Sequence, residues 1–212
     1  MASHFFAYLN RLRWIKRWGL KRNVVEENVM EHSWQVATIA HALALIKNRF
    51  FNGQVNAEQV AVLGLYHDVS EVITGDMPTP IKYHSPTITQ AYKAVEAEAE
   101  REILSYLPAK LQTDYQHLLL HEHANPEHTE LVKYADMISA YLKCQAELDA
   151  GNKEFQSASR QIEKRIRNTE APELHYFMEH FVTSYQLTID ELLSSHDRDL
   201  HQTQQSSHCQ RN

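Results

Sequence analysis

The sequence predicts an all-α protein, and two observations lead to that prediction. Apolar residues recur at spacings of three and four along most of the chain, which is the period of an amphipathic helix. Sustained apolar–polar alternation is missing, and the 212 residues include only five glycines and six prolines. We therefore expect a single helical domain over residues 1–194. A disordered tail should follow over residues 195–212, which are polar apart from one leucine.

The N-terminal segment predicts an amphipathic first helix followed by a basic turn. The apolar residues that would face the core are Phe5, Leu9, Leu12 and Ile15. Six basic residues precede the first acid, Glu26, so a transit peptide or a membrane-surface helix is an open alternative. The segment has no uninterrupted apolar stretch, which argues against a secretory signal.

The next two helices carry most of the chemistry. Over residues 27–50 the apolar face consists of His32, Val36, Ile39, Leu43 and Ile46, which places His32 towards the core. Residues 57–73, "AEQVAVLGLYHDVSEVI", predict a helix that continues until Gly75. Pro78 and Pro80 enforce its end. Further helices are expected at about 87–107, 109–123, 127–150, 153–169 and 173–193.

Charge and composition exclude several classes of protein. A formal net charge of −6 argues against general nucleic-acid binding, which favours basic domains. Apolar stretches fall well short of the roughly 20 residues that span a bilayer, so no membrane partner is expected. Cys144 and Cys209 form no disulfide framework, which favours a reducing, cytoplasmic compartment.

An adjacent histidine and aspartate, His67–Asp68, end an apolar helical face. A second such pair, His196–Asp197, lies in the polar tail and has no apolar setting, so we expect no function from it. Glu71 follows four residues after His67 and would share its side of the helix. The simpler interpretation of the first pair is a core histidine beside a carboxylate.

Two more inward ionisable residues favour a metal site instead. His32 lies on its helix's core face, and Asp136 lies between Val132 and Ala140 in an apolar or small-residue stripe. A buried carboxylate needs a cation or a proton, because an unpaired charge in a low dielectric is costly. The set His32, His67, Asp68 and Asp136 offers two imidazoles and two carboxylates, which suits Mn, Fe, Co, Ni or Zn. Four protein ligands also leave room for water.

A rival histidine cluster follows in "LLLHEHANPEH". His121 and His123 would point to different sides of a helix, and Asn125–Pro126 indicates a turn before His128. We interpret this cluster as a solvated helix end. Glu122 is its best candidate for a supporting role at the site.

Four local strings, taken together, resemble the HD-domain metal-dependent phosphohydrolases, and among them the bacterial 5′-deoxynucleotidases. They are "SHFFAYLNRLRWIKRW", "EHSWQVA", "LYHDVSEVITGDMPTPIK" and "LVKYADMISAYLKC". The resemblance runs from about residue 3 to about residue 193. It implies that His32, His67, Asp68 and Asp136 bind one divalent cation, Co, Mn or another transition metal, and that the protein is a homodimer.

The resemblance also implies a substrate site. The residues that would contact the substrate are Arg17, Trp18, His32, His67, Asp76, Met77, Pro78, Thr79 and Asp136. Glu71 would be the acid/base residue, and Arg17 would act on the phosphate as a catalytic group. From the residues alone, Arg17 could be a solvated charge, Trp18 a core aromatic and Glu71 an exposed helix carboxylate.

The expected activity is metal-dependent hydrolysis of deoxyribonucleoside 5′-monophosphates to deoxyribonucleosides and phosphate. Two alternatives remain at this point. One is another HD-type nucleotide hydrolase, a triphosphohydrolase or a phosphodiesterase of cyclic or alarmone nucleotides. The other is a non-catalytic HD protein that senses nucleotides. Glu71 distinguishes the last of these, because a sensor needs no acid/base residue beside its ligands.

Overall fold

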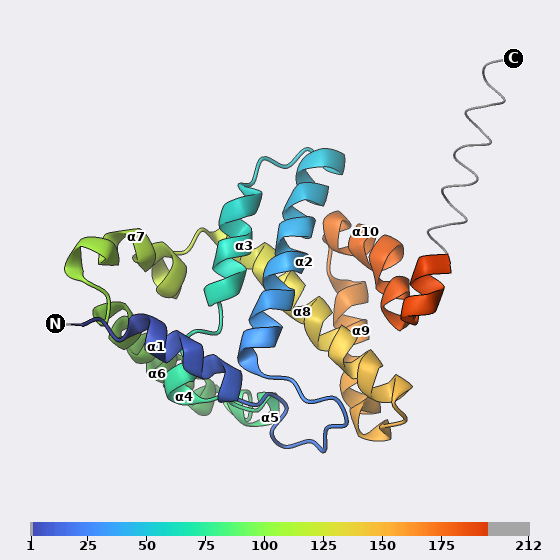
Figure 1. The fold of residues 1–212 in the computed structure, drawn as a ribbon, viewed down its shortest axis with the longest axis horizontal. Coiled ribbons are helices and arrows are strands. Elements are labelled where there is room, and N and C mark those ends of the chain that lie inside the picture. Colours follow the sequence, from blue (N-terminus) through green and yellow to red (C-terminus); the bar gives the residue numbers. More distant parts are fainter. Residues whose placement is uncertain (1, 195–212) are drawn as a thin grey trace, which may run out of the picture.

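The computed structural model describes residues 2–194, and these form a helical bundle (Figure 1). The predicted tail, including the control pair His196–Asp197, lies outside the described residues. The elements in chain order are α1 (Phe5–Leu9), η1 (Asn10–Trp14), α2 (Val29–Phe50), α3 (Ala57–Tyr66), α4 (Glu71–Thr74), α5 (Thr79–Lys82), α6 (Pro86–Ser105), α7 (Ala109–Leu119), η2 (His121–His123), α8 (Pro126–Asp149), η3 (Lys153–Phe155), α9 (Gln156–Asn168), α10 (Pro172–Phe181) and η4 (Val182–Gln186).

Helices α2, α3 and α8 pack against one another at the centre of the bundle. In Figure 1 α1, α6 and α7 lie on one side of them and α9 and α10 on the other. Asparagine side chains begin the three central helices: Asn28, Asn56 and Asn125 each accept a hydrogen bond from a backbone N–H of the first turn. The all-α prediction is confirmed for the described residues, whose one extended pairing is an isolated bridge between Lys16 and Asn28.

The core has two parts. The larger cluster joins α2, α3, α8 and α10 and includes the predicted Val36, Ile39, Leu43 and Ile46. The smaller cluster lies between α1, α6 and α7 and consists of Phe5, Val69, Ile103, Leu107 and Leu119. Leu63 belongs to the first cluster and Val69 to the second, so the segment between them crosses from one core to the other.

The predicted continuous helix from residue 57 to Gly75 is wrong. Helix α3 ends at Tyr66, residues 67–70 form turns, and α4 begins at Glu71. Hydrogen bonds in this segment span three residues, as from Val69 N to Tyr66 O and from Glu71 N to Asp68 O. The tighter winding turns Val69 into the second core, which a continuous α-helix would not do.

Three other predicted boundaries also differ. The first helix changes to 3₁₀ geometry at Asn10, although Phe5 and Leu12 are buried as expected. The helix expected to reach residue 123 ends at Leu119, because Leu120 is extended with ψ of 113°. The helix expected to reach residue 193 ends at Phe181 and continues as η4. Among the described helices, none combines the length and the apolar character that a membrane span requires.

Candidate active site

The two histidines of the predicted site are brought together by a close approach of α2 and α3. A Cβ on Gly64 would lie 2.8 Å from Cα of Ala37, so only glycine allows this packing distance. His67 caps the C-terminus of α3 three residues later, and His32 lies one turn before Val36 on α2. The ring centroids of His32 and His67 are 5.2 Å apart.

Hydrogen bonds determine which ring nitrogen of each histidine carries its proton. His67 Nδ1 donates to the Gly64 carbonyl at 2.7 Å, because a carbonyl can only accept. The Ser139 hydroxyl donates to Oε1 of Gln35 at 2.6 Å, so its oxygen accepts from Nδ1 of His32 at 3.1 Å. In the neutral rings both Nε2 atoms therefore carry lone pairs. Both are buried and, within residues 2–194, neither has a hydrogen-bond partner.

Asp68 completes a compact group with the two histidines. The ligand atoms of His32, His67 and Asp68 all lie within 4.8 Å of one another. Oδ2 of Asp68 is 3.1 Å from His67 Nε2 and 3.5 Å from His32 Nε2. Two lone pairs that face a carboxylate repel one another unless a cation or a proton lies between them. This donor set of two imidazoles and a carboxylate fits a divalent transition metal.

Asp136 lies at the edge of this group, on α8. Its Oδ1 is 3.1 Å from Nε2 of His32, and its side chain is 47% exposed. The prediction that Asp136 points inward therefore needs a correction, because the carboxylate faces a cavity and not the packed core. Burial raises the pKa of Asp136, but the His32 ring in its protonated form outweighs burial and lowers that pKa.

Arg17 reaches the same centre from the segment before α2. Its Nη1 is 3.2 Å from Asp68 Oδ2 and its Nε is 3.1 Å from Oε2 of Glu27. The Arg17 side chain is 12% exposed, so the interpretation of Arg17 as a solvated charge is wrong. Burial raises the pKa of Asp68, but His67 and then Arg17 outweigh burial and hold that pKa well below its usual range.

Trp18 has a dual role in the local structure. Its backbone adopts φ of 60°, a left-handed conformation that is uncommon for a bulky residue. Its backbone N–H donates to Oδ2 of Asp76 at 3.2 Å, and its indole N–H donates to Oε2 of Glu27 at 3.0 Å. The indole ring packs on Phe155 with centroids 5.3 Å apart. Trp18 therefore links the Arg17 segment to the predicted Asp76–Thr79 loop.

Glu71 is half-buried, and the carboxylates of Asp68 and Asp76 act on it. Its Oε2 is buried and, among the described residues, has no hydrogen-bond partner. Burial and the neighbouring charges of Asp68 and Asp76 raise the pKa of Glu71 to about 10. Without a bound cation this carboxyl carries a proton at neutral pH. The interpretation of Glu71 as an exposed helix carboxylate is therefore wrong.

The predicted substrate loop, Asp76–Thr79, is attached to the site through Asp76. Asp76 bonds to Trp18, and burial raises the pKa of Asp76. Gly75 adopts φ of 71° and turns the chain out of α4. Met77 and Pro78 follow half-buried, and Thr79 is exposed at the start of α5.

A cavity of about 560 Å³ opens onto the histidine–aspartate group. His67, Asp68 and Asp136 line its inner end, and residues of α6, α7, η2 and α8 form its walls. His121 and Glu122 of the rival cluster are exposed and line this cavity, whereas His128 is buried and does not line it. His121 and Glu122 therefore form a solvated rim of the cavity, whereas the predicted solvated position is wrong for His128.

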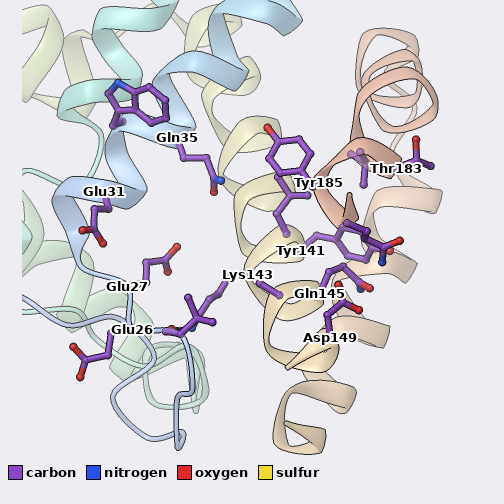
Figure 2. Close-up of a pocket in the computed structure, with 16 residues that line it drawn as sticks. Glu26, Glu27, Glu31, Gln35, Tyr141, Lys143, Gln145, Asp149, Thr183 and Tyr185 are labelled. Atoms are coloured by element: carbon purple, nitrogen blue, oxygen red, sulfur yellow. Dashed lines mark hydrogen bonds between the residues drawn. The ribbon is translucent and has the colours of Figure 1, made fainter. Parts of the chain in front are cut away.

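A second pocket, of about 420 Å³, lies behind the site between α2, α8, η4 and the segment before α2. Figure 2 shows Glu26 and Glu27 on one side of it, with Tyr141 and Gln145 of α8 on the other. Glu27, which binds Arg17 and Trp18, lines this pocket, and so does Gln35, which orients Ser139.

Sequence reasoning missed these supporting residues. Glu27 stands in an acidic run with no periodic apolar neighbours, and Ser139 and Gln35 are ordinary helix residues. A usable signal existed only for Ser139, which follows Asp136 by three residues and so shares its side of a helix.

The chain is similar to a family of known proteins over most of its length. The model of the YfbR-like 5′-deoxynucleotidase family matches residues 4–185. A 5′-deoxynucleotidase of Yersinia pestis (strain Pestoides F) is 54% identical over 190 residues, which cover 90% of this chain and 96% of that protein. A 5′-deoxynucleotidase of Yersinia pseudotuberculosis (strain PB1/+) matches to the same extent.

Solved structures share the fold at lower identity. An HD-domain phosphohydrolase from Listeria innocua superposes with a TM-score of 0.76 at 23% identity, covering 94% of this chain and 98% of that one. The cyanophage S-2L HD phosphohydrolase, bound to dA and one catalytic Zn²⁺ ion, has a TM-score of 0.61 at 22% identity and covers 84% and 96%.

The helical bundle has the fold of these HD-domain phosphohydrolases. Within that class, the chain belongs to the YfbR-like 5′-deoxynucleotidase family. The family resemblance read from the four sequence strings is thereby confirmed.

Proposed function

We propose that the chain is a divalent-metal-dependent phosphomonoesterase that converts deoxyribonucleoside 5′-monophosphates into deoxyribonucleosides and phosphate. The observation that carries the proposal is the pair of buried Nε2 lone pairs beside Asp68, with the guanidinium of Arg17 on the same carboxylate. The family of the chain supports the reaction, and the S-2L enzyme with dA and Zn²⁺ supports the kind of ligand. Cytoplasmic location and a homodimer are part of the proposal, and nucleic acid and membranes are not.

His32, His67 and Asp68 would hold the cation, and Asp136, 3.1 Å from His32, would complete the set. Such an ion would supply Lewis-acid stabilisation of the phosphate charge, and Co²⁺ or Mn²⁺ are our candidates. We assign its position to the histidines because their Nδ1 protons are already committed to Gly64 and Ser139. The tautomer needed for ligation is therefore prepared by the fold.

Arg17 would bind the phosphate. Its planar group has five N–H donors, and Asp68 and Glu27 use only part of them. Because these two carboxylates already hold the guanidinium, little side-chain entropy remains to be lost on binding. The negative charge that shifts among the phosphate oxygens in the transition state would be stabilised by this group. His32, His67 and Asp136 would border the same phosphate.

Glu71 would act as the acid/base residue that transfers the proton of the attacking water. Water would form the new bond to phosphorus, the bond to the 5′-oxygen would break, and the proton lost by water would end on that oxygen. Glu71 is the candidate for this transfer, since its buried Oε2 lacks a partner among the described residues. Asp76 with Met77, Pro78 and Thr79 would hold the sugar. An acid/base carboxyl at this place favours an enzyme over a non-catalytic nucleotide sensor.

A phosphate-release panel tests the proposal. The purified protein is stripped with a chelator, reloaded separately with Co²⁺, Mn²⁺, Zn²⁺ or Mg²⁺, and assayed on dAMP, AMP, dADP, dATP and a cyclic nucleotide. We expect release from dAMP only after reloading. Release of triphosphate from dATP, or conversion of the cyclic nucleotide to a monophosphate, each detected by chromatography of the products, would favour the other HD-type hydrolases. Binding of dAMP without release of phosphate would favour the sensor.

A further inference from the structure

We propose that Glu147, on α8, is a positioning residue for the reaction, because it holds the segment that presents Arg17 and Trp18. The inference rests on the proposed function, in which Arg17 binds the phosphate. We call residues 16–28 the Arg17 loop. Its base is closed by hydrogen bonds from Arg17 N to Glu27 O and from Val29 N to Ile15 O, both at 3.0 Å.

The far end of the Arg17 loop is fastened to a single carboxylate. Glu147 Oε2 accepts from the backbone N–H of Val24 at 2.9 Å, and Oε1 accepts from that of Val25 at 3.0 Å. The Asn152 side chain donates to Oε2 at 2.7 Å, and Lys143 donates to Oε1. The Glu147 side chain is fully buried. Every lone-pair direction of this carboxylate is thus occupied, which is how a buried charge is tolerated.

The same anchor holds the loop's carbonyls. Lys143 also donates to Val25 O, and Asn152 donates to Arg22 O at 2.7 Å. Lys21 donates to Glu154 O at 2.9 Å, and the ring of Trp18 packs on the buried Phe155. The loop is therefore held from residue 18 to residue 25 by the end of α8 and by η3.

Apolar burial contributes little to holding this loop. Leu20 is 64% exposed and Val24 is 60% exposed, so neither side chain anchors the segment. Trp18 is strained at φ of 60° and needs its surroundings to keep that conformation. The polar contacts of Glu147 therefore hold Val24 and Val25, and they support the loop beyond the direct contacts that fix Arg17 and Trp18 themselves.

Helix α8 connects this anchor to the metal centre. Asp136 and Glu147 are 11 residues apart on the same helix, which corresponds to about 16 Å along its axis. The helix thus carries Asp136 beside His32, and Glu147 beside the Arg17 loop about three turns later. Because the helix is rigid, it sets the distance between the centre and the Arg17 loop. Lys143 lies between these two levels, on the wall of the second pocket that Figure 2 shows.

Glu147→Gln tests the proposal. The amide keeps the shape but loses the charge that Lys143 and the two N–H groups require. We expect kcat/KM for dAMP to fall about 10- to 100-fold, since displacement of a positioned group has effects of that order. Metal content should stay unchanged. Amide hydrogen exchange at Val24 and Val25 should accelerate, which reports directly that the loop has been released.

A matched control and a milder variant distinguish a positioning effect from a folding defect. Glu173 is also buried and pairs with a lysine, Lys47 at 3.2 Å, but it joins α10 to α2 away from the loop. Glu173→Gln should leave KM for dAMP unchanged. If Glu147→Gln does not fold, Asn152→Ala removes the bonds to Glu147 and Arg22 O, together with the bond from Glu154 N that begins η3, and should show the same changes in weaker form.

A double-mutant cycle with Arg17→Ala separates positioning from general damage. If Glu147 acts through Arg17, then Glu147→Gln should cost less than about twofold in kcat/KM when Arg17 is already alanine. Additive losses, or unchanged exchange at Val24 and Val25, would overturn the inference. A wild-type protein that releases no phosphate would instead overturn the proposed function, and the exchange measurement would still decide whether Glu147 holds the loop.

Discussion

Two carboxylates, the partly buried Asp68 and the fully buried Glu147, have opposite surroundings. Glu147 is met by donors on every side: two backbone N–H groups, an amide and a lysine. Asp68 has Arg17 on one side but faces two histidine nitrogens whose protons are engaged elsewhere. A carboxylate whose hydrogen bonds are all made stabilises one geometry. Acceptor atoms that face one another without donors destabilise the metal-free protein. The comparison indicates that the cluster around Glu147 holds the structure, whereas the cluster around Asp68 is arranged to bind a ligand.

The largest expected effect comes from breaking the unsatisfied centre. Asp68→Ala removes the ligand that both histidines share and the anion that holds Arg17, so phosphate release from dAMP should fall at least about 10³-fold. Metal content, measured on the dialysed protein, should be lost. Asp197→Ala, in the second His-Asp pair of the sequence, is the control and should change neither. Equal effects of the two variants would contradict the contrast between the pairs.

Metal removal should also lower thermal stability, because binding relieves the repulsion among the acceptors. A cation present at 100 times its dissociation constant adds about 2.7 kcal/mol, or roughly 5–10 °C in a chain of this size. A thermal scan with and without chelator measures this. The same scan on Asp68→Ala should show no shift, and a shift of full size there would mean that the ion binds elsewhere.

Glu71 offers the next largest effect. Glu71→Gln should reduce kcat by about 10²- to 10⁴-fold while metal and dAMP still bind, since proton transfer is lost and ligation is not. Equilibrium binding of dAMP and metal analysis separate these possibilities. A variant that no longer holds the ion would show that Glu71 is a ligand. The proposed set of metal ligands would then be wrong.

Periodicity predicted the helical fold and the burial of His32, and long-range contacts explain what it could not predict. His32 lies on a clean apolar face, so its burial followed from spacing alone. The break after Tyr66 did not, because it depends on Val69 packing into a second core made by residues far along the chain. Glu147 was invisible for the same reason: it and Val24 are 123 residues apart, and no local pattern relates them.

Trp18 tests how far the held loop affects specificity. If its indole edge excludes the 2′-hydroxyl, that hydroxyl loses water without gaining a partner in AMP, at a cost of about 1–3 kcal/mol. Trp18→Ala should then narrow the ratio of kcat/KM between dAMP and AMP by roughly tenfold to a hundredfold. Trp14→Ala is the control, because that tryptophan is 61% exposed on η1. An unchanged ratio would place the discrimination elsewhere.

The smallest expected effect sharpens the comparison through acid stability. Burial opposes the charge of Glu147, but the bonds from Lys143, Val24 and Asn152 outweigh burial and lower the pKa of Glu147 from 4.5 to about 2. The unfolded chain takes up this proton near pH 4.5, so the contribution to stability is complete above that pH and is lost as the pH falls towards 2. Between pH 5 and pH 2.5 the melting temperature of the wild type should therefore fall roughly 5 °C more than that of Glu147→Gln. Parallel decreases would mean that the anchor gains nothing from the charge of Glu147, and the contrast with Asp68 would then rest on hydrogen-bond geometry alone.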